Sequence, residues 1–594
     1  MTRGYIGKVL FVDLSACKLK EEALEEKLCR DLIGGYGLGA RIIYSHQKAG
    51  VDPLGPENIL GFLTGPLTGT PTPTGTRYTV VGKSPLTGTW GDANSGGEFA
   101  PYLKFAGYDG VFFTGISDKP VYLFIDNGKA ELRDASHLWG KDTHETEDML
   151  EAEHGRDSRV CCIGQSGERL SLISCIITGK GCAAGRSGLG AVMGSKRLKA
   201  IVARGNQTVL VADSDTIDEV RREYLVALRA NIETFHKYGT ASHAARSAHN
   251  GDTPVKNWGG VGVIDFPDNS GIEADAVIAN LNKHSGCWHC PVACEGSLNE
   301  GTGEYKYPAG SRRPEYETLA SFGALVLNNN TESIAMANYI CNRYGIDTIS
   351  AGCTIAFAIE CYENGLITRE DTGGIELTWG NHRAIVAMTE KLAKREGFGG
   401  ILADGVKVAA EKIGKGAEEY AVHIGGQELG MHDPKLMLSQ FGDVASAAAR
   451  YQMDATPGRH TQGFGPSGFP RHVLSAAGLC LLGRTRGYLV KFISAVTGWD
   501  YSEDELLKTG ERIATMRHVF NLREGINPLE WQVHPRIIGK PPFESGPLAD
   551  VTADIEAQVY WNLGALDWDR VTTKPSKKKL LELGLDDVVK DLWP

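Results

Sequence analysis

Three cysteines in one short segment carry the clearest chemical signal of the chain. Cys287, Cys290 and Cys294 lie in the stretch C-W-H-C-P-V-A-C, which we expect to form a loop between two helical regions. Thiolates this close together can face one centre, and soft sulfur ligands suit iron-sulfur clusters or zinc. A structural zinc would normally be completed by a second local pair, but the next cysteine is residue 341. The spacing therefore favours an iron-sulfur cluster, with zinc or plain buried thiols as the alternatives.

The bulk composition indicates a large folded enzyme. A chain of 594 residues is too long to fold around a single hydrophobic core, so two to four domains are expected. A hydrophobic content of 42% is ordinary for a globular protein, and the formal charge of −11 is spread along the chain, which gives no support to nucleic-acid binding. We find neither a leader peptide nor a stretch long enough to span a membrane, so a cytoplasmic location is expected.

The hydrophobic pattern divides the chain into a sheet-rich part and a helical part. Short β-rich runs between turn residues appear from 5 to about 203, for example at 8–12, 78–81, 110–113 and 121–125. After about 209 a helical period takes over, and helices are predicted near 215–235, 315–327, 331–345, 351–365, 382–396 and 503–520. Two long glycine-rich connections, 249–272 and 455–470, are candidates for lining a site because loops of this length are often functional.

Several separated motifs, in this order along nearly the whole chain, resemble those of the tungsten-containing aldehyde:ferredoxin oxidoreductase family. Besides the cysteine motif they are G-T-R-Y (75–78), G-D-A-N-S-G-G (91–97), K-F-A-G-Y-D-G (104–110), G-R-S-G-L-G-A-V-M-G-S-K (185–196), P-E-Y-E-T (314–318), G-I-D-T (345–348) and F-N-L-R-E-G (520–525).

This resemblance implies an α+β fold in three parts. A β-sheet base domain that binds pterin would span 1–208, a helical domain with the cysteine motif 209–420, and a second helical domain with Cys480 the remainder, 421–594. The implied cofactors are a tungsten or molybdenum held by two pterins in the cleft, one 4Fe-4S cluster and a magnesium ion. Glycine-rich turns suit pterin phosphates because their main chain can approach closely.

The resemblance also assigns cofactor contacts. Arg77 would lie between pterin and cluster, and main-chain oxygens of Asn94 and Ala184, or Ala183 in the neighbouring register, would bind the magnesium. Two six-residue motifs, 342–347 and 475–480, would also contact the pterins. Asn342 and Ser475 stand where the family has an aspartate, which removes negative charge beside the pterins. The further residues assigned to the cofactor are Ser95, Gly96, Gly185, Arg186, Gly345, Ile346, Asp347, Gly478, Leu479 and Cys480.

The implied chemistry is the oxidation of an aldehyde. Cys480 would be the fourth cluster ligand beside Cys287, Cys290 and Cys294, and Tyr316, Glu317 and His460 would be the catalytic residues. Glu317 is expected to exchange protons, with a pKa raised by burial, and His460 to donate to the substrate carbonyl.

The implied function is therefore conversion between aldehydes and carboxylic acids, with electrons passed to ferredoxin or a small polyferredoxin subunit and the chain in an oligomer or hetero-complex. Two alternatives stay open. One is a relative that reduces another substrate class, such as an aromatic ring. The other is a non-catalytic electron-transfer subunit.

Overall fold

The computed structural model describes residues 3–441, 447–483 and 485–594, and within them two six-stranded sheets occupy the N-terminal part of the chain. In hydrogen-bonded order the first sheet contains β2 (Lys18–Ala23), β1 (Lys8–Asp13), β6 (Gly110–Thr114), β3 (Leu60–Leu63), β4 (Tyr78–Lys83) and β5 (Trp90–Ser95). The second contains β11 (Cys182–Ala184), β10 (Ile176–Thr178), β9 (Ser158–Cys162), β12 (Leu198–Arg204), β7 (Val121–Asp126) and β8 (Lys129–Asp134). These strands confirm the sheet-rich first part of the predicted α+β fold.

The two sheets share one hydrophobic core. That core joins Leu10 and Phe62 of the first sheet to Leu123 and Ile201 of the second. Each sheet contains one parallel pair, β1 with β6 and β12 with β7, while the other described neighbours are antiparallel. Strands β3 and β4 are buried along their whole length, whereas the edge strands β2 and β8 are polar and half exposed, as expected for edges that face water.

Helices cover the outer face of each sheet. The first sheet is covered by α2 (Gly35–His46), α20 (Phe469–Ala476), α21 (Leu489–Thr497), α22 (Glu503–Arg523), α24 (Lys577–Glu582) and α25 (Asp586–Leu592). The second sheet packs against α4 (Thr143–His154). Adjacent Cys161 and Cys162 enter different cores because successive strand residues point to opposite faces.

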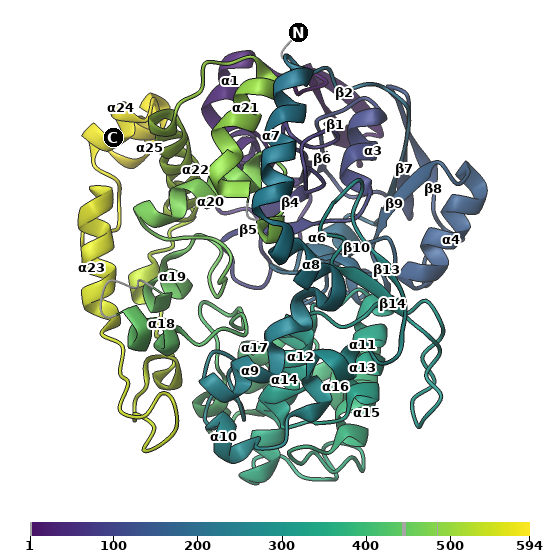
Figure 1. Ribbon diagram of the computed structural model, residues 1–594, viewed down its shortest axis with the longest axis vertical. Coiled ribbons are helices and arrows are strands. Elements are labelled where there is room, and N and C mark those ends of the chain that lie inside the picture. Colours follow the sequence, from purple (N-terminus) through teal and green to yellow (C-terminus); the bar gives the residue numbers. More distant parts are fainter. Residues whose placement is uncertain (1–2, 442–446, 484) are drawn as a thin grey trace.

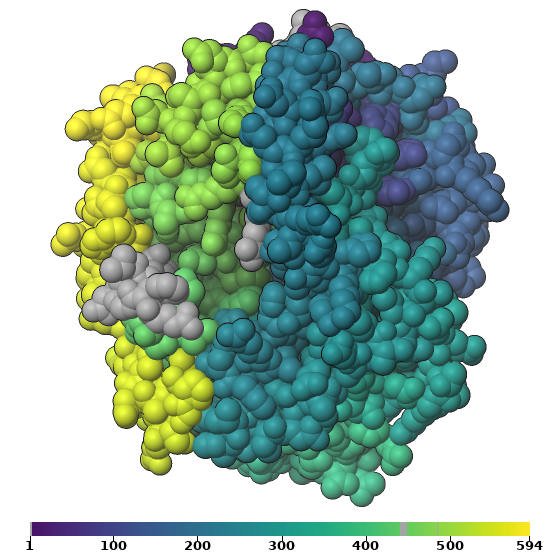
Figure 2. All heavy atoms as spheres, viewed as in Figure 1, coloured from purple at the N-terminus to yellow at the C-terminus, as the bar shows by residue number. Residues whose placement is uncertain are grey.

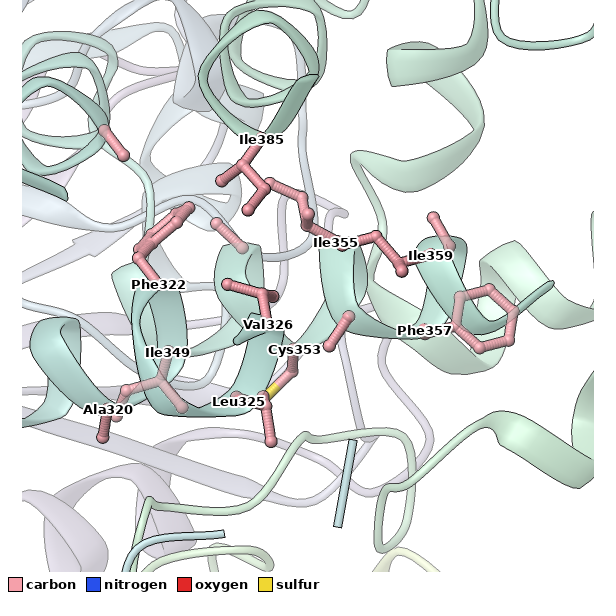
Figure 3. Close-up of a cluster of buried hydrophobic side chains, with 14 of the residues drawn as sticks. Ala320, Phe322, Leu325, Val326, Ile349, Cys353, Ile355, Phe357, Ile359 and Ile385 are labelled. Carbon is pink, nitrogen blue, oxygen red and sulfur yellow. The ribbon is translucent and has the colours of Figure 1, made fainter. Parts of the chain in front are cut away.

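A helical body lies below the sheets in Figure 1, and its core is drawn in Figure 3. Apolar side chains such as Phe322, Val326, Ile355 and Ile385 meet at its centre. Its main helices are α9 (Ala244–Asn250), α12 (Tyr316–Phe322), α13 (Thr331–Tyr344), α14 (Thr348–Glu363), α15 (His382–Lys394), α16 (Phe398–Leu402) and α17 (Gly405–Ile413). Cys341, Cys353 and Cys361 are buried in this core, which extends past residue 420 and includes Tyr451 and Ile537. The predicted division at residues 208 and 420 stays a prediction.

The remaining elements enclose the space between body and base. Figure 2 shows a hollow between the dark teal segment, with α7 (Ser214–Ala227) and α8 (Arg229–Tyr238), and the green segment, with α19 (Ala447–Met453) and α20. The helices α18 (Pro434–Phe441) and α23 (Ile555–Leu566) lie at the outer edge of this side in Figure 1. None of the described helices combines the length and apolar character that crossing a membrane requires.

The cysteine motif lies in a loop, as predicted, but two unpredicted strands flank it directly. They are β13 (Leu281–Ser285) and β14 (Glu295–Leu298), which pair antiparallel, so the motif is at the tip of a hairpin. These strands are four and five residues long, and three of the five residues of β13 are exposed, so the helical period of the flanking regions conceals them.

Candidate active site

The four cysteines assigned to the cluster line one cavity of about 240 Å³. Cys287, Cys290 and Cys294 come from the hairpin loop, and Cys480 comes from the other end of the chain. The main-chain N–H of Gly97 donates to Sγ of Cys287 over 3.1 Å, and a Cβ at residue 96 would stand only 2.7 Å from that sulfur. Gly96 is therefore required by the close approach of the hairpin to the sheet domain.

Cys480 is brought to this cavity by a main-chain pairing. Helix α20 ends before Gly478, whose φ of +84° turns the chain back. Leu479 then forms a β-bridge with Gly75, and the N–H of Cys480 donates to the carbonyl of Thr74 over 3.2 Å. A contact across about 400 residues is thus fixed by backbone hydrogen bonds, and the position of Cys480 does not depend on its own side chain.

Arg77 lies on the boundary between this cavity and a second one. Its guanidinium donates to Sγ of Cys480 over 3.1 Å and to the side-chain oxygen of Asn94 over 3.3 Å. Burial alone would lower the pKa of Arg77, but the neighbouring sulfurs of Cys480 and Cys287 raise it. The side chain is therefore a permanent cation beside the cysteines.

A fifth cysteine, Cys182, also lines the first cavity, and no signal in the sequence singles it out. Sγ of Cys182 donates to Oε1 of Glu295 over 3.2 Å, and Sγ of Cys287 lies 3.4 Å from the same oxygen. Arg312 donates to the other oxygen of Glu295 over 2.5 Å. A buried carboxylate paired to a guanidinium therefore adjoins the cysteine loop.

The second cavity, of about 400 Å³, is larger and adjoins the first. The two share part of their lining: Arg77, Gly181, Ala183, Glu315, Asn338, Asn342, Cys480 and Leu482. Of the predicted cofactor residues, Asn94, Gly185, Arg186, Ile346, Asp347 and Ser475 line the second cavity, while Ser95 and Gly96 line the first. Its walls come from the sheet domain, the helical body and the green segment of Figure 2, which supplies His460 and Ser475.

The two six-residue motifs are placed in the same way. Just as Leu479 pairs with Gly75, Ile346 forms a β-bridge with Ser174, after Gly345 turns the chain with a φ of +73° at the end of α13. Gly345, Gly478, Leu479 and Ala184 are absent from the described lining of both cavities. Gly345, Gly478 and Leu479 are therefore placed to hold the chain in position, and the residues that face the cavities are Asn342, Ile346, Asp347, Ser475 and Cys480.

Several polar atoms beside the cavities find no hydrogen-bond partner among the described residues. They are Nε of Arg77, Oγ of Ser95, Nε of Arg186 and Oε1 of Glu317. Nε of Arg186 is nevertheless 3.0 Å from Oδ2 of Asp347, a contact that the angle excludes as a hydrogen bond. Buried polar groups left without partners indicate that a ligand or water completes the site.

Glu317 and His460 meet at the wall of the second cavity. Nε2 of His460 lies 3.1 Å from Oε1 of Glu317, and Oε2 of Glu317 accepts the N–H of Met431 over 2.9 Å. Burial raises the pKa of Glu317 and lowers that of His460 well below its usual range. The carboxyl therefore holds a proton more readily than an ordinary glutamate, while the imidazole stays neutral and can donate a hydrogen bond.

A second imidazole, His432, approaches the same carboxylate. Its Nε2 lies 3.7 Å from Oε1 of Glu317, and both oxygens of Asp252 lie 3.1 Å from its Nδ1. His432 carries no signal in the sequence, because a single histidine before Asp433 and Pro434 is typical of a turn.

Tyr316, predicted to be catalytic, is absent from the described lining of the second cavity. Its hydroxyl contacts Oγ1 of Thr253 at 2.6 Å and donates to the carbonyl of Met431 over 2.8 Å, while its ring stacks on His432 at 4.7 Å. The side chain therefore orients the residues around Glu317 and is not placed to touch a substrate in the cavity. Its adjacency to Glu317 in the sequence concealed this difference, because neighbours at a helix start point in different directions.

Three more residues of the site were not selected from the sequence. Glu315 is half-buried, lines both cavities and accepts from Thr240. Arg459 lines the second cavity beside His460. Gly430 leaves room for the ring of His460, because a Cβ at residue 430 would overlap its Nδ1.

Comparison with known proteins places the chain in one family. The family model for the aldehyde ferredoxin oxidoreductase N-terminal domain matches residues 9–205, and that for domains 2 and 3 matches 219–467 and 470–585. The tungsten-containing aldehyde ferredoxin oxidoreductase of Pyrococcus horikoshii is 37% identical, with 98% of this chain and 99% of the relative covered. An aliphatic sulfonate oxidoreductase, WOR-like subunit, of Pyrococcus furiosus is 32% identical over 99% of this chain and 98% of its own length.

Among solved structures, the active-site complex BamBC of benzoyl coenzyme A reductase, in complex with 1,5 dienoyl-CoA, has the same fold. Its TM-score is 0.83 at 24% identity, with 100% of this chain and 98% of that chain covered. Matches to both family models and identities above 30% over nearly the full length show that this chain belongs to the aldehyde ferredoxin oxidoreductase family.

Proposed function

We propose that this protein oxidises aldehydes to carboxylic acids and passes the two electrons through a 4Fe-4S cluster to ferredoxin or an iron-sulfur partner subunit. The observation that carries the proposal is the pair of adjoining cavities, one lined by four cysteines and the other by Glu317 and His460, with Arg77 on their boundary. Relatives over 30% identical whose names specify tungsten and aldehyde support it.

The residues fit the cofactors that the family implies. Four thiols on one cavity suit a cubane cluster, and the unpartnered buried Nε atoms of Arg77 and Arg186 suit anionic groups such as pterin phosphates. Asn94, Ala183 and Gly185 would present main-chain atoms to those phosphates and to a magnesium ion. Ala183 is a better candidate than Ala184 for the main-chain oxygen that binds magnesium, because Ala183 belongs to the lining of both cavities.

The chain contributes two groups to the chemistry of the substrate. When bound, a tungsten bis-pterin supplies the two-electron redox centre at which the aldehyde is oxidised. His460, held neutral by burial, donates from Nε2 to the carbonyl oxygen of the aldehyde and polarises it. Glu317, whose pKa burial raises, accepts the proton released as water adds to the carbonyl carbon.

The boundary between the cavities supplies the electron path. Arg77 contacts Cys480 and lines both cavities, so it would lie between the cluster and the pterin when both are bound. Its permanent charge would stabilise the reduced cluster electrostatically.

The proposal is tested with the anaerobically purified protein loaded with its cofactors. We expect benzaldehyde or acetaldehyde to reduce benzyl viologen, together with one tungsten or molybdenum and one 4Fe-4S cluster per chain by elemental analysis. Iron without either heavy metal would instead favour the electron-transfer subunit. Loaded protein that reduces an aromatic ring with low-potential electrons but does not oxidise aldehydes would favour the reductase.

A further inference from the structure

Oxidation of an aldehyde by water yields a carboxylic acid, two electrons and two protons, and the protons need a way out of the site. Glu317 is 22% exposed and is placed to receive the first proton. Carboxylate oxygen Oε2 is occupied by the N–H of Met431, so Oε1 is the atom that exchanges protons. Two imidazole nitrogens approach this atom, from His460 at 3.1 Å and from His432 at 3.7 Å.

The two histidines differ in what lies behind them. His460 lines the cavity, and among the described contacts its main-chain carbonyl accepts from Arg450. His432 is absent from the described lining and faces a carboxylate on its other side, because both oxygens of Asp252 lie 3.1 Å from Nδ1. Glu317, His432 and Asp252 thus form a row of acid, base and acid.

His432 and Asp252 are both accessible to solvent. The side chains of His432 and Asp252 keep 37% and 24% of their surface exposed, and neither belongs to the described lining of that cavity. A proton on His432 can therefore be passed to water.

We propose that His432 carries protons from Glu317 to solvent, with Asp252 stabilising its imidazolium form. This inference rests on the proposed aldehyde oxidation. In each transfer the O–H bond at Oε1 of Glu317 breaks and an N–H bond forms at Nε2 of His432. The imidazolium then returns one proton to water, and no electrons move in this step because they leave through the cluster.

The contacts and charges around His432 support a role different from that of His460. The ring of His432 is held by stacking on Tyr316 at 4.7 Å, and the main-chain carbonyl of His432 accepts from Tyr451 over 2.8 Å. Burial alone would lower the pKa of His432, but the hydrogen bond to Asp252 and the charge of Glu317 raise it. Of the two imidazoles, His432 is therefore the one that becomes charged at moderate pH.

The first test is chemical rescue of His432→Ala in the loaded enzyme. We expect kcat for aldehyde-dependent viologen reduction to fall at least roughly 10-fold, because general acid-base groups contribute about 10²–10⁴ to rate. Added imidazole should restore it in proportion to its concentration and leave the parent enzyme unchanged, with KM altered less than about 3-fold.

His249→Ala is the matched control, since His249 is half-buried in the neighbouring segment and contacts the carbonyl of Phe266 at 3.2 Å. It should keep its activity and show no response to imidazole. A fall in the kcat of His432→Ala that imidazole does not restore would contradict the relay and indicate a structural role for His432. Unchanged kcat would contradict it as well.

The second test is Asp252→Asn, which leaves His432 in place. Removing this charge should move the acid limb of the kcat profile to lower pH, because a carboxylate that favours the imidazolium is lost. An unmoved limb would contradict the role of Asp252. The charged and titratable groups that face His432 are Asp252, Glu317, Tyr316, His460, Arg450 and Tyr451.

The proposed function and the relay fail differently. Loaded parent enzyme that does not oxidise aldehydes overturns both. Active parent enzyme, combined with a His432→Ala variant that behaves like the control, overturns the relay alone.

Discussion

The two cavities are built from different kinds of sequence signal. The cysteine cavity takes three of its four proposed ligands from one hairpin loop, so a local spacing identifies it. The larger cavity takes Glu317, His460 and Asp347 from three distant segments, and no local spacing joins them. Ligands of a cluster can be clustered in sequence because they must face one small centre, whereas a substrate pocket needs groups on opposing walls.

The cavities also differ in their polar groups. Five cysteines line the first, four of them proposed cluster ligands, while the second contains a carboxyl and an imidazole whose pKa values burial moves in opposite directions. Removing one of the four proposed cluster ligands should therefore abolish electron transfer. Removing Glu317 or His460 should instead slow only the reaction of the substrate.

The largest effect is expected for Cys480→Ala. Without one thiolate the cubane loses a ligand, so the cluster should be lost or converted to a three-iron form, and viologen reduction should fall to the background. Iron analysis and low-temperature EPR measure this. Cys361→Ala, at a buried cysteine remote from both cavities in the helical core, is the control. An intact cubane in Cys480→Ala would show that residue 480 is not a ligand.

Glu317→Gln should leave the cluster intact and lower kcat by about 10² to 10⁴, the range of a lost general base. The parent kcat/KM should rise with pH through the pKa of Glu317, which burial places above its ordinary value, because the base acts in its deprotonated form. This limb should disappear in the variant. A variant that keeps the limb would assign the base to another residue.

A smaller effect, roughly 10-fold on kcat, is expected for Gly430→Ala, because displacing His460 removes one aligned hydrogen bond, worth about 1.4 kcal/mol. Gly487→Ala is the matched control, since a Cβ at residue 487 meets nothing within 4 Å. Equal activities of the two variants would show that the position of His460 does not matter.

The smallest effect is expected for Arg77→Lys. The charge is retained, but a single ammonium cannot replace the two guanidinium nitrogens that donate to Asn94 and Cys480, so electron transfer should slow a few-fold. Stopped-flow absorbance of the cluster after mixing with aldehyde measures this rate. A larger loss than in Glu317→Gln would show that Arg77 binds the cofactor rather than only joining the cavities.

Much of the fold follows from the sequence because the underlying signals are local. The runs at 8–12 and 78–81 form β1 and β4, and the helical periods at 331–345 and 382–396 form α13 and α15. The hairpin of the cysteine motif was missed because its strands are short and β13 is largely exposed, so no hydrophobic alternation marks it.

The site could be predicted less fully, since its geometry depends on contacts across the chain. Cys480 needed the family resemblance, because spacing could not choose it over Cys341, Cys353 or Cys361. His432 and Asp252 had no local signal at all, and only the approach of segment 249–253 to residue 432 brings them together. Tyr316 was assigned beside Glu317, and the sequence does not reveal that its hydroxyl contacts the main chain of Met431 and that it is absent from the described lining of the second cavity.

The most direct test of the account is whether aldehyde reduces the cluster inside the protein. Loaded parent enzyme and Glu317→Gln should be mixed anaerobically with benzaldehyde, frozen at successive times and measured by EPR, with dithionite as the reference reductant. The account predicts a reduced-cluster signal with aldehyde in the parent, a much slower one in the variant, and equal signals with dithionite. A parent cluster that dithionite reduces but aldehyde does not would contradict the central claim.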